Sequence, residues 1–252
     1  FSYTLIQGYD FYHLNNHHGV VMQIGGSDQW GNCLSGVDLI RKTRGAEVDV
    51  VTLNLIIDKT TGRKFGKSEG GAVWLDETKT SPYKFYQFWL NAGDLDAIDY
   101  LKIFTLLEKE EIDSLAEEMQ TNAASRPAQK RLAYEVTKIV HGQERADGVK
   151  RISEVLFGAQ GYDALTAHDM QDLESELQTV EVTAGSSLLD FMCETGLAKS
   201  KSEARRFLSD GAVYINGMQL PIDQMEFAEH DSIHGHAIVR RGKNTTALAK
   251  FA

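Results

Sequence analysis

The chain has 252 residues, of which 42% are hydrophobic, 9% aromatic and 25% charged, and this composition predicts a soluble globular protein of two or three domains. Its net charge of −10 at pH 7 argues against a generally basic nucleic-acid binder. No apolar run approaches the roughly 20 residues that span a bilayer, so no membrane role is expected. The two distant cysteines, Cys33 and Cys193, predict neither a disulfide framework nor a zinc site and suit a reducing cytoplasm.

The negative charge is unevenly distributed along the sequence. Residues 183–252 contain 8 basic and 8 acidic side chains, whereas residues 1–182 contain 18 basic and 28 acidic ones. Any contact with a polyanion must therefore come from local basic clusters.

The first 57 residues alternate between helix-like and strand-like patterns. We predict a helix over 1–18, a strand over 20–24, a helix over 27–43 capped by Ser27 or Asp28 and closed by Gly45, and a strand over 48–57. This order predicts part of a parallel α/β sheet, in which ligands bind beyond the carboxyl ends of the strands.

The remainder of the chain divides into a helical part and a mixed part. Helical periodicity starts at Ser81-Pro82 and continues to about residue 157, and the acidic, weakly patterned segment that follows fits a linker with at most one short helix. The tail predicts helices over 188–194 and 200–210, an Asn216-Gly217 hairpin, and strands over 237–240 and 247–251. We therefore predict domains over 1–80, 81–165 and 187–252, with a linker over 166–186.

Two polar motifs occur in the α/β part. Gly25 and Gly26 end the first predicted strand and would let the backbone approach a ligand, while Asp28 suits ribose hydroxyls; an ordinary strand-to-helix turn is the alternative. Upstream, one face of the first predicted helix carries three polar side chains at positions i, i+4 and i+7: the phenol of Tyr3, the amide of Gln7 and the carboxylate of Asp10. This face fits either the wall of a pocket or a solvent-exposed surface.

The loop TGRKFGKSEGG at residues 61–71 follows the second predicted strand. Gly62 and Gly66 are separated by three residues, one fewer than a P-loop needs. Lys64 and Lys67 could instead meet the charge that develops in phosphoryl or adenylyl transfer, or the loop could be a solvated turn.

Basic residues form two short clusters in the tail. A few such groups can contact an RNA backbone, although a mixed solvated surface is the alternative. The first cluster contains Lys199, Lys201, Arg205 and Arg206, and the second contains Arg240 and Arg241.

In order along the chain, SYTLIQGYD, QIGGSDQWGN, KFGKS and SPYKFYQFW resemble the bacterial tyrosyl-tRNA synthetase family. KFGKS is similar to the mobile "KMSKS" loop of class I synthetases, and the tail resembles an S4-type RNA-binding domain. The resemblance implies an α/β C-terminal part of a Rossmann-like catalytic domain, then an all-α anticodon-binding domain and a small α+β S4-like domain. It also implies ATP-dependent activation of tyrosine, assisted by Mg²⁺, with transfer to tRNA(Tyr) by a homodimeric enzyme.

The same resemblance assigns roles to individual residues. Lys64 and Lys67 match loop lysines that stabilise the pyrophosphate leaving group. Residues matching the tyrosine site are Tyr3, Gln7, Asp10, Gln23 and Gln29, and those matching the ATP and adenylate site are Gly26, Asp28, Lys67 and Ser68. No resident metal site is implied.

One departure from the family pattern is the lack of an H-I-G-H-like signature in these residues. We therefore expect a fragment that lacks the first half of the nucleotide-binding fold and is inactive alone. Two alternatives stay open: a non-catalytic S4-type RNA-binding protein, and an NTPase that uses the 61–71 loop.

Overall fold

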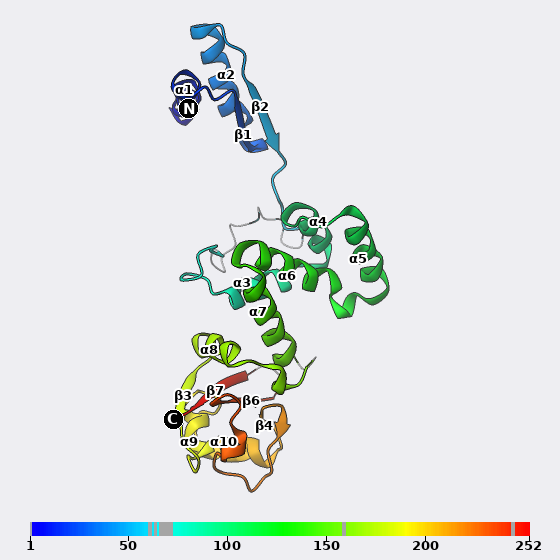
Figure 1. Ribbon diagram of the computed structural model, residues 1–252, viewed down its shortest axis with the longest axis vertical. Coiled ribbons are helices and arrows are strands. Elements are labelled where there is room, and N and C mark those ends of the chain that lie inside the picture. Colours follow the sequence, from blue (N-terminus) through cyan, green and yellow to red (C-terminus); the bar gives the residue numbers. More distant parts are fainter. Residues whose placement is uncertain (1, 60–61, 63–64, 66–72, 158–159, 243–244) are drawn as a thin grey trace. The chain divides into compact units, whose positions relative to one another are not determined.

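The computed structural model describes all residues except 1, 60–61, 63–64, 66–72, 158–159 and 243–244 (Figure 1). The chain divides into two compact units, Phe1–Ala72 and Val73–Ala252. Within the described residues, no helix combines the length and apolar character needed to cross a membrane.

Where the structure describes it, the first unit contains two α-helices and a two-stranded parallel sheet. Strands β1 (Met22–Gly26) and β2 (Asp49–Leu53) pair from Met22 opposite Asp49 to Gly26 opposite Leu53. Helices α1 (Ser2–His18) and α2 (Trp30–Arg44) pack against each other. A Cβ on Gly36 would lie 2.9 Å from Phe11, so glycine permits this close crossing.

The predicted elements of this unit are confirmed, but one predicted cap is wrong. Ser27–Gln29 form a 3₁₀ turn, and α2 begins at Trp30 without a side-chain cap. Neither Ser27 nor Asp28 therefore caps α2, because the chain tightens into 3₁₀ geometry before the helix begins. Gly45 closes α2 in the left-handed conformation, with φ of 64°.

Five helices begin the second unit and confirm the predicted helical segment. At its start, the Ser81 hydroxyl accepts a hydrogen bond from the Lys84 amide at 3.2 Å, and Pro82 occupies the first helical turn. The helices are α3 (Pro82–Leu90), α4 (Asp94–Phe104), α5 (Lys109–Asn122), α6 (Pro127–His141) and α7 (Gln143–Leu156). Trp89 packs edge-on against Tyr100 in their core.

A five-stranded sheet with the order β3-β7-β6-β4-β5 follows, together with short helices. The strands are β3 (Thr179–Val182), β4 (Val213–Ile215), β5 (Met218–Gln219), β6 (His236–Arg241) and β7 (Thr245–Phe251). The helices are α8 (Ala167–Glu176), α9 (Leu188–Glu194) and α10 (Lys201–Ser209). Asn216 and Gly217 form the predicted hairpin turn, with φ of 48° and 80°.

The segment 166–186, expected to be a linker with at most one short helix, contains the helix α8 and also the strand β3. Thr166 and Asp169 form a capping box at the start of α8, and β3 pairs in parallel with β7. Met170 and Leu173 are fully buried in a core with Ile238 and Leu248. The segment is therefore packed into the second unit through these buried side chains, although its acidic composition suggested an exposed linker.

Candidate functional site

The carboxyl ends of β1 and β2 lie side by side because the strands are parallel and Gly26 pairs with Leu53. A Cβ on Gly26 would lie 2.7 Å from Asp28 Oδ1 and 3.1 Å from Leu55 Cδ2. Glycine at this position therefore allows Asp28 and the segment after β2 to approach the same backbone. Two predicted groups, Gly26 and Asp28, thus lie together at the sheet edge where ligands bind in this class of fold.

Phe65 is a described residue between the predicted phosphate-binding lysines. Its amide donates a 2.9 Å hydrogen bond to the Ile56 carbonyl, which ties Phe65 to the segment that follows β2. Lys64, Lys67 and Ser68 themselves lie outside the described residues.

Helix α1 contributes a polar wall next to the start of α2. Thr4 Oγ1 donates to Asn32 Oδ1 at 2.8 Å, and Asn32 Nδ2 donates to Gln29 Oε1 at 3.0 Å. Gln7 Nε2 contacts Cys33 Sγ at 3.5 Å. These bonds bring the predicted residues Gln7 and Gln29 to the same helix–helix junction.

The other predicted tyrosine-site residues are placed differently. Tyr3 is 62% exposed and Asp10 is exposed on α1, so neither is enclosed by the described residues. On β1, Gln23 Oε1 is buried and has no hydrogen-bond partner among the described residues. A buried, unpaired acceptor is costly unless a ligand or another part of the protein donates to it.

In the second unit, the two predicted basic clusters meet on one aromatic ring. The guanidinium groups of Arg206 and Arg241 lie 5.4 and 5.0 Å from the centre of the Phe207 ring. Arg240 lies 4.6 Å from the Tyr214 ring centre on the neighbouring strand. Cation–π contacts of this kind hold guanidinium groups without cancelling their charge.

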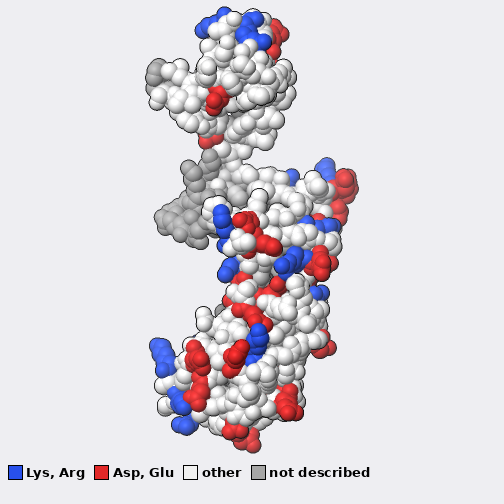
Figure 2. Space-filling model, turned by 60° about the vertical axis from the view of Figure 1, so that its left-hand side comes forward, with Lys and Arg blue, Asp and Glu red and all other residues white. Residues whose placement is uncertain are grey.

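Several charges in these clusters already have partners. Lys201 pairs with Asp190, and Arg206 lies 3.5 Å from Glu203. Arg241 Nη1 donates to the Leu197 carbonyl at 2.7 Å. Lys199 and Arg205 are exposed on the surface near these pairs. Figure 2 shows basic and acidic side chains interspersed over this unit.

Two family models match the chain. One, described as "tRNA synthetases class I (W and Y)", matches residues 1–158, and the other, described as "Tyrosine--tRNA ligase SYY-like C-terminal domain", matches residues 169–249. The chain belongs to the tyrosyl-tRNA synthetase family. The resemblance stated from the sequence is thereby confirmed. The second match begins within the expected linker, in agreement with the packing of α8.

Curated relatives of this synthetase family align with nearly the whole chain. The tyrosine–tRNA ligase of Latilactobacillus sakei is 44% identical over 256 residues, which cover 99% of this chain and 60% of the relative. That of Lactobacillus johnsonii is 45% identical over 254 residues, covering 100% and 60%. The chain therefore spans about 60% of the length of these relatives.

A solved structure of the same family also matches. It is a C-terminally truncated mitochondrial tyrosyl-tRNA synthetase of Coccidioides posadasii, with 31% sequence identity and a TM-score of 0.49. The match covers 59% of this chain and 43% of that chain.

Some residues of the synthetase chain that order the site were missed from the sequence. Thr4 and Asn32 join α1 to Gln29, and the only available signal was their position one turn from Gln7 and Gln29. In the second unit, Glu174 accepts from Lys250 at 2.9 Å and lies 2.7 Å from His236 Nε2. Sequence separations of more than 60 residues gave no hint of that cluster.

Proposed function

We propose that this chain is the C-terminal part of a tyrosine–tRNA ligase. The enzyme joins the carboxylate of tyrosine to the α-phosphate of ATP, releases pyrophosphate, and passes the tyrosyl group to tRNA(Tyr). The observation that carries the proposal is the meeting of Gly26, Asp28 and the segment leading to residues 61–71 at the carboxyl edge of β1 and β2. The matches to named ligases favour this function over a non-catalytic RNA-binding protein.

The proposed residue roles are carried over from the family resemblance, and they fit the chemistry of the substrates. Asp10 accepts a hydrogen bond from the phenolic hydroxyl of tyrosine, and phenylalanine would not offer that bond, a kind of discrimination for which tyrosyl-tRNA synthetase is the established example. Tyr3 and Gln7 hold the amino group, and Gln23, with its unpaired buried oxygen, is a further acceptor. Gln29 completes the tyrosine site next to the reacting carboxylate.

The adenylate half of the proposed site uses backbone approach and charge. Gly26 leaves room for the nucleotide, and Asp28 accepts from the ribose hydroxyls. Lys64, Lys67 and Ser68 close over the phosphates, and the lysines stabilise the negative charge that moves onto pyrophosphate as the bond to the α-phosphorus breaks.

ATP enters this site as its magnesium complex. The described residues contain no group of three or more His, Cys, Asp and Glu side chains that could hold a metal. Mg²⁺ usually binds through substrate phosphates with one or two carboxylates, and such a site needs no larger protein cage. The ion supplies charge neutralisation of the phosphates.

The second unit would hold the tRNA. We assign its helical part to the anticodon arm and the α+β part to an S4-like RNA contact made by Lys199, Lys201, Arg205, Arg206, Arg240 and Arg241. We also assign the whole enzyme to the cytoplasm as a homodimer, and residues 1–80 to the C-terminal part of a Rossmann-like catalytic domain. Because the chain spans about 60% of its relatives, we expect these 252 residues to be inactive alone.

The decisive experiment uses the full-length enzyme and compares Lys67→Ala with Lys42→Ala. Lys42 is an exposed lysine on α2 that lies 4.0 Å from Asp38. Lys67→Ala should slow adenylate formation by about a hundredfold, with little change in tyrosine binding, because a leaving-group contact acts mainly in the transition state. Lys42→Ala should change neither.

Two results would contradict the proposal. Equal losses of tyrosine binding and adenylate formation in Lys67→Ala would remove the assigned role of the loop. Tyrosine-dependent ATP–pyrophosphate exchange by the 252 residues alone would refute the expectation that this part is inactive.

A further inference from the structure

Two histidine side chains lie together on the outer face of α1. His13 and His17 are four residues apart, so their side chains are neighbours on one side of the helix. The buried residues of α1 are Gly8, Phe11 and Asn15. Because two residues correspond to about 200° of helix rotation, His13 and His17 lie opposite this buried stripe. Both histidines are exposed as a result.

The two imidazole rings are close enough to bind one metal ion. Their ring centres are 4.3 Å apart and their planes are inclined by 35°. Two imidazoles that bind one ion at about 2.0–2.1 Å place their ring centres roughly 4.5–5 Å apart. The described residues offer His13 no hydrogen bond or ion pair, and His17 Nε2 has only a 3.4 Å contact with the Asn16 amide. A small rotation of either exposed side chain therefore lets both rings bind the same ion.

The end of α1 that carries these histidines is fixed in place. The Gly19 amide donates to the Asn15 carbonyl at 3.2 Å, and Asn15 Nδ2 donates to the Val20 carbonyl at 2.9 Å. Arg44 Nη1 donates to Asn15 Oδ1 at 2.6 Å, which joins this end to α2. A rigid turn loses little conformational entropy when it binds a ligand. The carbonyl end of a helix also carries a partial negative charge, which favours a bound cation.

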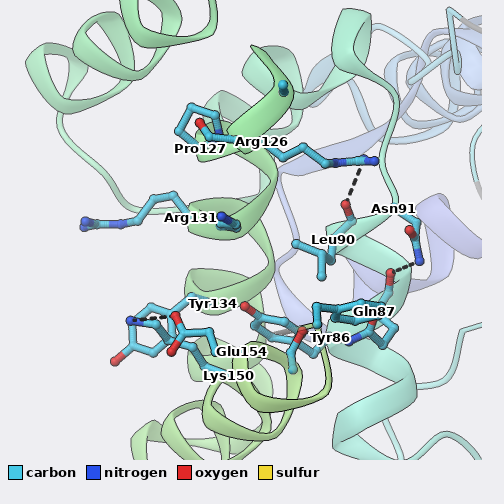
Figure 3. A pocket seen from close by; sticks show the side chains of 15 residues that line it. Tyr86, Gln87, Leu90, Asn91, Arg126, Pro127, Arg131, Tyr134, Lys150 and Glu154 are labelled. Atoms are coloured by element: carbon cyan, nitrogen blue, oxygen red, sulfur yellow. Dashed lines mark hydrogen bonds and ion pairs between the residues drawn. The ribbon is translucent and has the colours of Figure 1, made fainter. Parts of the chain in front are cut away.

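Two groups in the second unit that resemble metal ligands already have partners. The His236 ring lies 2.7 Å from the Glu174 carboxylate and 2.9 Å from the His234 carbonyl. In a pocket between α3, α6 and α7, the Glu154 carboxylate pairs with Lys150 at 3.9 Å (Figure 3). A metal ion would have to displace these partners, whereas it meets no such competition at the histidine pair on α1.

We propose that His13 and His17 together bind one divalent transition-metal ion of the copper, nickel and zinc group. Imidazole nitrogen suits these ions, whereas Mg²⁺ and Ca²⁺ prefer oxygen ligands. Histidines at i and i+4 on a helix are also the spacing of helical zinc sites. Cu²⁺ should bind most tightly, with Ni²⁺ and Zn²⁺ below it.

The protein supplies only part of the coordination shell. No group of three or more His, Cys, Asp and Glu side chains that could hold a metal occurs among the described residues, so water completes the shell. Leu14 follows His13, where hydrolytic zinc helices carry a glutamate base, and we therefore assign binding and no catalysis to the pair. The inference does not rest on the proposed ligase activity, since neither histidine belongs to the proposed tyrosine or ATP site.

The test is a calorimetric titration of the 252-residue chain with NiCl₂, and with MgCl₂ as a separate probe. Loss of a hydrogen bond to a metal ligand typically costs about 10- to 100-fold in affinity, so loss of a ligand itself should cost at least about tenfold. His13→Ala and His17→Ala should therefore each weaken Ni²⁺ binding by at least that factor. If the two histidines bound separate ions, each variant would instead keep one ion at unchanged affinity, and that result would contradict the shared site.

The matched control is His18→Ala, which removes the next histidine of the same helix. The His18 ring centre is 6.4 Å from that of His13, outside the range for the pair, so this change should leave Ni²⁺ affinity unaltered. All three positions are exposed, and alanine favours a helix, so the far-ultraviolet circular dichroism of each variant should match the wild type. Equal losses in His13→Ala and His18→Ala, Mg²⁺ binding as strong as that of Ni²⁺, or no Ni²⁺ binding at millimolar concentration would overturn the proposal.

Discussion

The ion pair of Asp169 and Arg151 is the most sharply testable structural element of the second unit. Asp169 on α8 has a side chain only 1% exposed, and it accepts from Arg151 Nε at 2.7 Å and Nη2 at 3.0 Å. It also accepts from the Thr166 amide and hydroxyl, each at 2.8 Å. One carboxylate therefore joins α7 to α8 and caps α8 as well.

We expect Asp169→Asn to destabilise the unit by about 2–3 kcal/mol. Removing one partner of a fully buried ion pair costs about 3–5 kcal/mol because the other charge stays buried. Arg151 is 31% exposed, so water offsets part of that cost. The control is Asp172→Asn on the same helix, which breaks the pair with Arg145, whose side chains are 25% and 31% exposed. That change should cost about 1 kcal/mol or less, the range of a partly solvated pair.

The assay is urea unfolding of the 252-residue chain at several pH values, followed by circular dichroism and by tryptophan fluorescence. Burial favours the protonated form of Asp169, but hydrogen bonds from Arg151 and Thr166 outweigh it, so its pKa lies below the usual 3.8. A depressed folded-state pKa contributes stability above about pH 4, and this is lost as the pH falls through the folded-state pKa. The difference between wild type and Asp169→Asn should therefore be constant from pH 7 to about 5 and shrink below about 4.

The reasoning would be refuted by either of two results. If Asp169→Asn and Asp172→Asn lowered the free energy of unfolding equally, burial of the carboxylate would not determine how much an ion pair stabilises this unit. If the Asp169→Asn difference grew as the pH fell below 4, the pKa of Asp169 would be raised in the folded state, against the assigned hydrogen bonds.

Three further predictions concern single contacts. Gly26→Ala should lower the free energy of unfolding of the first unit, measured in urea, by about 1–2 kcal/mol, because the new Cβ would clash with Asp28 and Leu55. The control is Gly31→Ala, whose new Cβ would have no described atom within 4 Å, so this change should be neutral or stabilising. Glu174→Ala should cost about 1–2 kcal/mol by the same measurement, because it removes hydrogen bonds to β6 and β7. Arg205→Ala should lower the slope of log K against log salt for tRNA binding by about 0.7–0.9 and leave the melting temperature unchanged.

The fold was largely predictable where local signals and burial agree. The proline at the start of α3, the Asn216-Gly217 turn and the glycine at position 45 each act within a few residues, and all three predictions are confirmed. The segment 166–186 was not recognised, because α8 and β3 owe their order to partners far along the chain, such as Ile238 and Leu248. The many acidic residues of this segment weaken the hydrophobic periodicity from which its buried helix and strand could have been predicted.

The candidate site was predictable as motifs but not as contacts. The pairing of β1 with β2 explains why Gly26 and the segment after β2 meet, and parallel pairing was expected from the order of elements. The hydrogen bonds from Thr4 through Asn32 to Gln29 depend on how α1 and α2 cross, which a single sequence does not specify. The roles of the predicted site residues, and the domain boundaries, stay predictions.

The proposed contact of this acidic chain with tRNA depends on which groups its basic side chains already bind. A carboxylate partner fixes a basic side chain but cancels its charge, as Asp190 does for Lys201. A carbonyl partner fixes the side chain and leaves the charge in place, as Leu197 does for Arg241 and Leu90 does for Arg126. Because the salt dependence of phosphate binding reports only charge that is not already neutralised, the number of basic residues overstates the phosphate contacts that this chain can make. Cations held by carbonyls are the ones that should contribute most.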